Sequence, residues 1–151
     1  METLNENELK LFVESVRLYF KKLTREEPLI TSAFLATGDL QGYDYNGIVT
    51  FSGAYNGHVI VSMPGPLLRE LLLLQGENDL SQANLLDAVG EIANTLAGNA
   101  RKHFGGDMEI SVPKTAAGAI GNSGSRKRPY VIMVSWKTYS ASLVVDIERL
   151  D

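Results

Sequence analysis

Four residues between positions 87 and 98 have the types and the spacing to act together on a binding partner. Asp87, Glu91, Asn94 and Gly98 recur at steps of three and four residues, so a helix that advances about 100° per residue places them in one narrow stripe. The stripe offers two carboxylates, an amide that both donates and accepts hydrogen bonds, and one position without a side chain. The position without a side chain, Gly98, would let another backbone approach closely.

The helix that carries these residues is predicted from Asp87 to Gly105, in "DAVGEIANTLAGNARKHFG". Glycine and asparagine are poor helix formers, and glycine costs about 0.8 to 1 kcal/mol relative to alanine. A glycine on the outward face is therefore better explained by docking than by stability. On the opposite side an apolar stripe is expected to pack on a sheet, and it consists of Leu85, Val89, Ile92, Leu96 and Ala100.

An ordinary solvated helix face is the alternative interpretation of the polar stripe. It is strongest for Asp87, because an acidic residue in the first turn also interacts favourably with the helix dipole. For Glu91 and Asn94 the opposed apolar stripe and the position of Gly98 favour a functional role. Asn99 lies near the border of the apolar stripe, where we expect a buried side chain with hydrogen-bond partners.

The stretch "GEIANTLAGNARKHF" resembles the Glu-x-x-Asn helix of the CheC/CheX/FliY phosphatases of bacterial chemotaxis, which dephosphorylate the response regulator CheY. The resemblance covers most of the chain, including an amino-terminal helix, a central hairpin that ends in "VIVSMP", and "SVPKTAAG", which is similar to the family's Ser-x-Pro segment and following glycine. CheC members with two motifs carry a second Glu-x-x-Asn on the first helix, where this chain has Glu14-Ser15-Val16-Arg17. The single motif is similar to the CheX-like branch, and the resemblance implies a homodimer.

The resemblance implies an enzyme that hydrolyses the phosphoaspartate of a CheY-like receiver domain. The receiver would supply the Mg²⁺, so no cofactor or metal is expected to belong to this chain. Phosphoryl transfer is catalysed mainly by positioning and charge stabilisation, which suits Asn94 as the residue that orients the attacking water. Glu91 would accept a charge-assisted hydrogen bond from the active-site lysine of the receiver. Asp87 would widen this contact, and Gly98 would let the receiver backbone approach.

The elements around this helix follow from hydrophobic periodicity and turn residues. Before it we expect a helix over residues 5–23, a strand over 30–38 and a hairpin over 46–64 that turns at Asn56-Gly57. A short apolar helix within residues 65–76 should start at Pro66 and end near Gly76. After it we expect a strand over 108–113 and a second hairpin with strands over 130–136 and 142–149.

Helix, strand and hairpin thus occur twice, offset by roughly 80 residues, which predicts an internal pseudo-repeat. The expected fold class is α+β, a two-layer CheC-like arrangement in which long helices pack on a mixed β-sheet. We expect residues 1–151 to form a single domain of this kind.

Composition excludes several classes of protein. The net charge of −4 at pH 7 and a pI near 5.2 argue against a nucleic-acid or anionic-membrane partner, and the absence of cysteine excludes disulfides and thiolate chemistry. No signal core or apolar run of roughly 20 residues is present, so we expect a cytoplasmic protein. One basic run, Arg126 to Arg128, ends a glycine-rich loop that lacks the Gly-Lys-Ser/Thr of nucleotide sites. Contact of this run with an acidic partner stays open.

Two other functions compete with the receiver phosphatase. The first is a non-catalytic module of the same fold that binds a receiver or a flagellar-switch component. The second is a small-molecule acid/base enzyme that uses Asp87 and Glu91, for which the sequence offers no convergent His, Lys or Tyr nearby. The intact pair of Glu91 and Asn94 favours the phosphatase.

Overall fold

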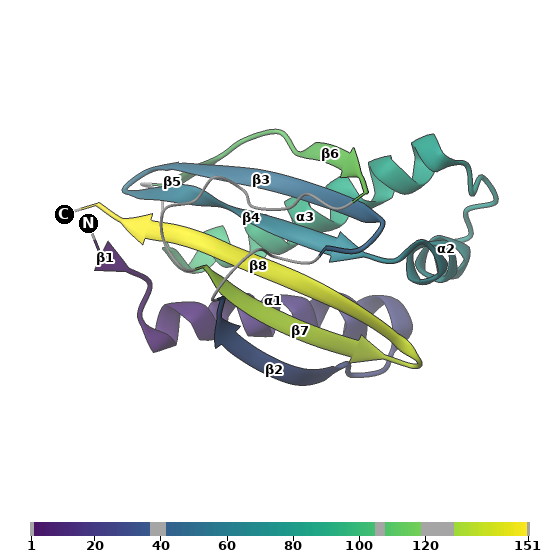
Figure 1. Cartoon of the computed structure of the whole chain (residues 1–151), viewed down its shortest axis with the longest axis horizontal. Helices are drawn as coiled ribbons and strands as arrows, with labels where there is room; N and C mark the ends of the chain where they lie inside the picture. The colour runs from purple at the N-terminus through teal and green to yellow at the C-terminus, as the bar shows by residue number, and fades with distance from the viewer. Residues whose placement is uncertain (1, 37–41, 105–107, 119–128, 151) are drawn as a thin grey trace.

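The structure is a computed structural model, and it describes residues 2–36, 42–104, 108–118 and 129–150 (Figure 1). Its elements in chain order are β1 (Glu2–Thr3), α1 (Glu6–Thr24), β2 (Leu29–Leu35), β3 (Tyr45–Gly53), β4 (Tyr55–Met63), α2 (Gly65–Leu74), α3 (Gln82–Phe104), β5 (Met108–Ile110), β6 (Lys114–Ala117), β7 (Tyr130–Trp136) and β8 (Tyr139–Arg149). Each predicted helix and strand is present, and β1 and β6 are additional.

The sheet confirms the predicted pseudo-repeat at the level of topology. Its strands follow the path β2-β7-β8-β4-β3-β5, with β1 beside β8 and β6 beside β3. Exchanging the two copies of the repeat, β2 for β5, β7 for β3 and β8 for β4, gives the same path in reverse. The two copies are therefore related by an approximate twofold axis, and the first strand of each copy lies beside the hairpin of the other.

The prediction of a mixed sheet is wrong, because every described strand pair is antiparallel. The twofold relation explains this result, since it reverses the direction of the central strand β4 relative to its counterpart β8. The α+β class and the two-layer arrangement are confirmed. The additional strand β6 has no buried side chain, so it lacks the alternation of apolar and polar residues that marks a strand in the sequence.

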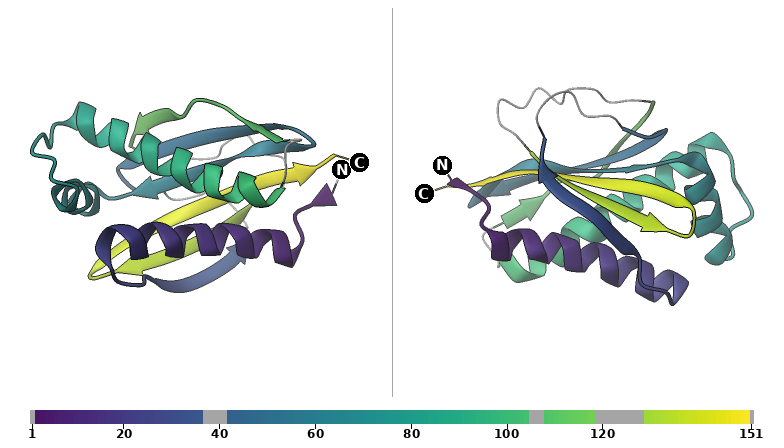
Figure 2. Two further views of the ribbon diagram at one scale, coloured as in Figure 1. Left: turned by 180° about the vertical axis from the view of Figure 1, so that it is seen from behind. Right: turned by 60° about the horizontal axis from the view of Figure 1, so that its bottom comes forward.

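The helices form the second layer on one face of this sheet. Seen from that side, α1 and α3 lie next to each other and run in opposite directions, while α2 lies at the end where α3 begins (Figure 2). The main core fills the space between the layers, and its fully buried side chains include Phe12, Phe20, Leu67, Leu68, Leu71, Leu85 and Val89. All five residues of the predicted apolar stripe are buried.

The first hairpin is present, but its turn lies at Gly53 and Ala54 rather than at Asn56-Gly57. Gly53 adopts the positive φ of 100° at the turn. Gly57 lies inside β4 and also has a positive φ, 140°, for a different reason. A Cβ on Gly57 would overlap the carbonyl oxygen of Asp146 in β8, so this glycine serves the close approach of two strands.

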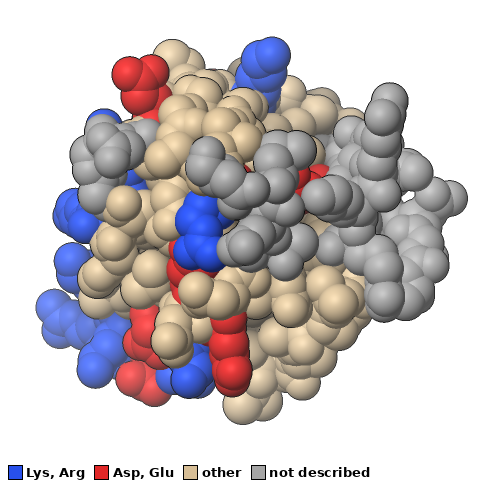
Figure 3. All heavy atoms as spheres, turned by 90° about the vertical axis from the view of Figure 1, so that its left-hand side faces the viewer, with Lys and Arg blue, Asp and Glu red and all other residues tan. Residues whose placement is uncertain are grey.

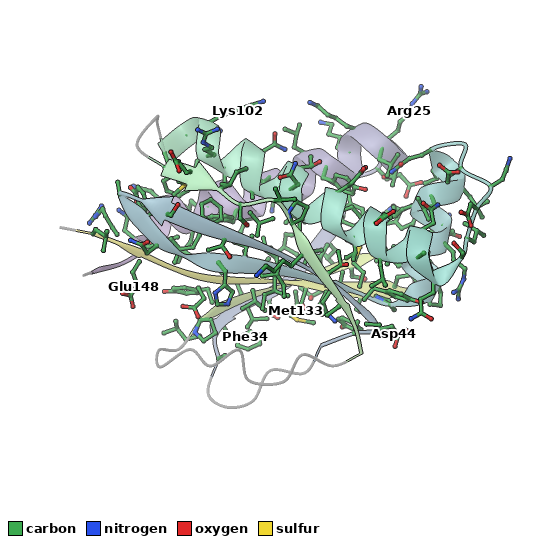
Figure 4. All side chains as sticks on the ribbon, turned by 90° about the horizontal axis from the view of Figure 1, so that it is seen from above. Arg25, Phe34, Asp44, Lys102, Met133 and Glu148 are labelled. Atoms are coloured by element: carbon green, nitrogen blue, oxygen red, sulfur yellow. The ribbon has the colours of Figure 1, made fainter. Side chains whose placement is uncertain are left out.

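The face of the sheet opposite the helices carries a smaller apolar cluster, formed by Ala36, Ile60, Val131 and Val144. Phe34 and Met133 extend from this same face (Figure 4). Within the described ranges, no helix is both long and apolar enough to cross a membrane.

Candidate functional site

The polar stripe lies on the outward face of α3, as predicted. Asp87, Glu91 and Asn94 are exposed, and Gly98 is partly exposed. The helix begins with a side-chain cap, because the Oγ of Ser81 accepts a hydrogen bond from the N–H of Asn84 at 3.3 Å. The cap and the buried stripe together hold this face in one orientation relative to the sheet.

A close contact between α3 and β3 determines the position of the middle turn of α3. Gly47 of β3 lies under this turn, and a Cβ at Gly47 would overlap the carbonyl oxygen of Val89 and lie 3.1 Å from the Cβ of Ala93. Only glycine lets the helix backbone come this near. The turn that carries Glu91 and Asn94 is therefore rigidly positioned on the sheet.

The segment from Ser111 to β6 supports the same turn from a second side. A Cβ on Gly90 would lie 2.8 Å from the Cγ2 of Thr115 and 3.6 Å from the Cβ of Pro113. Ser111 is joined to Thr50 by two hydrogen bonds, one donated by each backbone N–H, and both are 2.9 Å long. Gly90 thus belongs to the packing between α3 and the Ser-x-Pro segment, which explains one poor helix former.

The two motif side chains are free for an external partner. Neither Glu91 nor Asn94 forms a hydrogen bond or an ion pair with another described residue. A Cβ built on Gly98 meets nothing within 4 Å, so the space above this glycine is open. Asn99 differs from the prediction, because it is only half-buried and has no hydrogen bond to a described residue. Asn99, at the border of the apolar stripe, is therefore more exposed to solvent than the helical periodicity predicts.

Beside this face lies a pocket that the sequence did not predict. It has a volume of about 240 Å³ and opens where α1, α2 and α3 meet. Tyr19 of α1 lines it together with Asp87 and Glu91, so the expectation that no tyrosine lies near these acids is wrong. Periodicity alone predicts that Tyr19 lies on α1 but not which residues of α3 face it, because the packing of two helices is not encoded locally.

Tyr19 does not support the small-molecule acid/base interpretation. Burial, and secondarily the negative charge of Glu91, raise the pKa of its phenol far above the usual range. A base that works near neutral pH needs a pKa near that pH. Tyr19 therefore stays a neutral phenol.

The equivalent place on α1 is occupied by an internal ion pair. The twofold relation of the fold matches Glu14 and Arg17 to Glu91 and Asn94, and the Nη1 of Arg17 lies 3.2 Å from the Oε1 of Glu14. An arginine in place of the amide holds the carboxylate that a partner would otherwise contact. Of the two equivalent carboxylates, Glu14 is paired with Arg17, whereas Glu91 of the predicted motif forms no ion pair with a described residue.

Charge changes sign along α3. The acidic residues Asp87 and Glu91 lie in its first half, and Arg101 and Lys102 lie in its last turn. Because α3 begins at Gln82, Asp87 does not lie in the first turn as predicted, so the helix dipole favours only the two cations. At the end of the molecule where β8 ends, Lys and Arg side chains gather along one side (Figure 3). A partner that docks on α3 therefore meets an acidic and a basic end, which favours one orientation over its reverse.

Among the described residues, no group of three His, Asp or Glu side chains is arranged to hold a metal ion. The prediction that any Mg²⁺ comes from the partner stays a prediction. The basic run Arg126 to Arg128 and most of its glycine-rich loop lie outside the described residues.

Solved structures of chemotaxis proteins are similar to this chain over nearly its whole length. A CheC-like superfamily protein from Shewanella sp. PV-4 is 21% identical, with a TM-score of 0.83 over 96% of this chain and 99% of its own. The chemotaxis protein CheX from Vibrio vulnificus is also 21% identical, with a TM-score of 0.77 over 94% of this chain and 99% of its own. A chain of the CheX–CheY–BeF₃–Mg²⁺ complex from Borrelia burgdorferi is 18% identical, with a TM-score of 0.72 over 93% of this chain and 97% of its own.

These likenesses show that the fold is the CheC-like fold. No curated protein matches the chain. The model of the chemotaxis phosphatase CheX family matches residues 45–135, which run from the start of β3 to the penultimate residue of β7. Since this match covers more than half of the sequence, the chain belongs to the CheX family of chemotaxis phosphatases.

Proposed function

We propose that this protein hydrolyses the phosphoaspartate of a CheY-like receiver domain, with the receiver supplying the Mg²⁺. The observation that carries the proposal is the free pair of Glu91 and Asn94, exposed on a helix turn that Gly47 and Gly90 position rigidly, in a member of the CheX family. The similarity to the CheX–CheY–BeF₃–Mg²⁺ complex supports both the partner and the source of the metal. As expected from the sequence, the reaction would take place in the cytoplasm.

Asn94 acts as the residue that orients the attacking water. Its amide oxygen accepts a hydrogen bond from the water while its NH₂ group donates to a phosphoryl oxygen, so no shifted pKa is needed. Because the backbone turn that carries Asn94 is already positioned by packing, docking on the receiver has to order only the side chain to place the water in line with the scissile bond. Chemistry of this kind depends on positioning rather than on a nucleophile of the protein.

Glu91 acts as the anchor. Its carboxylate accepts a charge-assisted hydrogen bond from the active-site lysine of the receiver, one helix turn from Asn94. Asp87 widens this acidic contact, and Gly98 leaves room for the receiver backbone at the other end of the stripe. The four residues form one docking face.

We further propose that two copies of the chain pair through β2. This strand is seven residues long, "LITSAFL", and its outer edge pairs with no described strand. It carries no charge and no proline, and Leu29, Phe34 and Leu35 are 66%, 46% and 39% exposed. An unguarded edge of this kind is a template for strand pairing, and antiparallel pairing of β2 with a second β2 gives a closed, twofold dimer.

The decisive test is the release of phosphate from phosphorylated receiver domains encoded in the same genome, with and without the protein. At least one receiver should lose its phosphoryl group faster when the protein is present, and the acceleration should disappear in an Asn94→Ala variant. A non-catalytic module that docks on a receiver or switch component is the second candidate. A chain of the FliM–SpeE complex from H. pylori has a similar fold, at a TM-score of 0.58 and 12% identity, which is compatible with this candidate. Binding without acceleration would select it.

A further inference from the structure

The pocket at the junction of α1, α2 and α3 is suited to receive one side chain of a partner. Its volume of about 240 Å³ is below the roughly 300 to 1,000 Å³ of small-molecule sites. Glu91 belongs both to its lining and to the docking face. A receiver docked over Glu91 and Asn94 therefore covers the mouth of the pocket.

The lining combines an apolar floor with an acidic rim. Aliphatic carbon comes from Leu68, Leu71, Leu72 and Ile92, which are buried. Three acids, Glu77, Asp87 and Glu91, line the pocket, and no Lys or Arg is among its described lining residues. A long aliphatic stem with a cationic end matches both parts, since Lys and Arg bury their stems against apolar surface and keep the charged group in a polar environment.

Tyr19 provides an acceptor for such a cation. Tyr19 lines the pocket, and its hydroxyl oxygen is enclosed and has no hydrogen-bond partner among the described residues, which is costly for a buried polar group. A partner's side chain therefore reaches this oxygen only when side chains around the pocket shift. Because burial and Glu91 raise its pKa, the group remains a phenol, whose oxygen accepts a hydrogen bond from an ammonium or guanidinium. A cation in the pocket would satisfy this orphan group and be balanced by the neighbouring carboxylates.

We propose that this pocket binds one Lys or Arg side chain of the phosphorylated receiver, distinct from the active-site lysine that pairs with Glu91. The assignment rests on the proposed function and makes it more specific. Receivers with a basic side chain at the matching place on their surface are the preferred substrates, and receivers without one are poor substrates. Tyr19 is a specificity-determining residue in this view, not a catalytic one.

The first experiment separates binding from chemistry with Tyr19→Phe, which removes only the hydroxyl. The KM for the phosphorylated receiver should rise about tenfold, as expected for the loss of one hydrogen bond to a charged group, while kcat stays unchanged. Tyr130→Phe, on the half-buried Tyr130 of β7, is the matched control and should change neither value. A merely structural role of Tyr19 would lower the melting temperature and leave KM unchanged.

A second pair of variants tests charge without touching Tyr19. Gln75→Lys places a cation in the lining of the pocket, and Gln82→Lys places the same charge on an exposed residue outside it. The former should raise KM about tenfold because it repels or replaces the receiver side chain, and the latter should not. Equal KM values for both variants and the unaltered protein would overturn the assignment.

Double-mutant cycles then identify the receiver residue. Each exposed Lys and Arg of the receiver is changed to Ala and combined with Tyr19→Phe, and binding is measured on the beryllium fluoride form of the receiver with Mg²⁺. One basic residue other than the active-site lysine should couple to Tyr19. Coupling to the active-site lysine alone, or to none, contradicts the proposal, as would binding of a free polyamine that leaves receiver affinity unchanged.

The outcomes distinguish the two proposals. If the unaltered protein accelerates no receiver, the proposed function fails and this assignment fails with it. If the unaltered protein is active while Tyr19→Phe and Gln75→Lys behave like their controls, only the pocket assignment is overturned.

Discussion

The chemistry proposed for this protein depends on side chains that have no internal partner. Glu91 and Asn94 are exposed and free, whereas the equivalent Glu14 is held by Arg17 at 3.2 Å. The pair of Glu14 and Arg17 is largely exposed and weak in itself, but a cation of a partner would have to compete with Arg17 for the carboxylate. The difference between the two helices therefore lies in availability rather than in position.

Asn94→Ala should lower the rate of receiver dephosphorylation by about 10²-fold, the loss typical of one positioned polar group. The fold should be unaffected, because the side chain is exposed and forms no hydrogen bond with another described residue. Stopped-flow measurement of phosphate release checks the rate, and affinity for the beryllium fluoride form of the receiver serves as the control. A variant with most of its activity would remove Asn94 from the mechanism.

Glu91→Gln should mainly weaken docking, since it removes a charge and keeps the shape. If the contact with the receiver lysine is desolvated, the loss is on the order of 2 to 5 kcal/mol of binding free energy. Titration calorimetry with the beryllium fluoride form measures it directly. Glu14→Gln is the matched control on α1 and should bind normally. Unchanged affinity of Glu91→Gln would assign the anchoring role to another residue.

At the residue scale, the sequence predicted the stripes of α3 well because the helical period alone determines them. All five apolar positions are buried, and Asp87, Glu91 and Asn94 are exposed. Tyr19 could not be found in this way. Its place beside Glu91 depends on how α1 and α3 pack, which involves residues more than 70 positions apart along the chain.

At the scale of the element, α3 uses its glycines for opposite purposes. Gly90 faces Thr115 and Pro113 inside the fold, while Gly98 faces open space. One glycine makes the helix fit its support, and the other leaves room for an external backbone. The position of each relative to the apolar stripe decides its role.

Gly98→Gln should separate stability from function. The melting temperature should stay the same or rise, because a Cβ there meets nothing within 4 Å and glycine costs about 1 kcal/mol in a helix. Dephosphorylation should fall, since the added side chain keeps the receiver backbone away from Glu91 and Asn94. Thermal unfolding and phosphate release measure the two effects on the same sample.

Gly90→Ala is the control in the same helix. Its Cβ would lie 2.8 Å from the Cγ2 of Thr115, so Thr115 must move and the gain in helix propensity is lost; the melting temperature should not rise.

Full activity of Gly98→Gln would show that the stripe is not the contact surface. Unfolding of Gly98→Gln would show that Gly98 faces a neighbouring element.

Turn chemistry misled the prediction of the first hairpin for a physical reason. Asn-Gly is favoured in tight turns because both residues tolerate positive φ. Gly57 does have a positive φ, 140°, but it uses this freedom inside β4 where Asp146 approaches. Asn-Gly in a sequence indicates that positive φ is tolerated there. Whether a turn or a close contact between strands requires the positive φ becomes clear only from the pairing of β4 with β8.

At the scale of the whole molecule, the approximate twofold axis explains both the sheet and its edges. The order of helix, strand and hairpin was sufficient to predict two copies, but the sequence of one copy does not specify that β2 crosses to the hairpin of the other. The mixed sheet was therefore predicted wrongly. The two edges have also diverged, because β5 is three residues long and β2 is seven.

The difference between the two edge strands, β2 and β5, determines which edge of the sheet can pair with a second copy of the chain. The short β5 ends one side of the sheet, whereas β2 presents an uncharged edge with three exposed apolar side chains. Phe34→Lys introduces a charge of the kind that natural edge strands use to prevent pairing. Sedimentation velocity should give the mass of a dimer for the unaltered protein and of a monomer for Phe34→Lys.

Val112→Lys is the matched control, because Val112 is 83% exposed and lies between β5 and β6; this variant should remain a dimer. Since β2 and the docking face of α3 are separate surfaces, Phe34→Lys should still dephosphorylate the receiver when it is monomeric. A Phe34→Lys protein that stays dimeric would move the interface elsewhere. A monomeric protein without activity would mean that the dimer is required to complete the docking face, which would tie the two surfaces together.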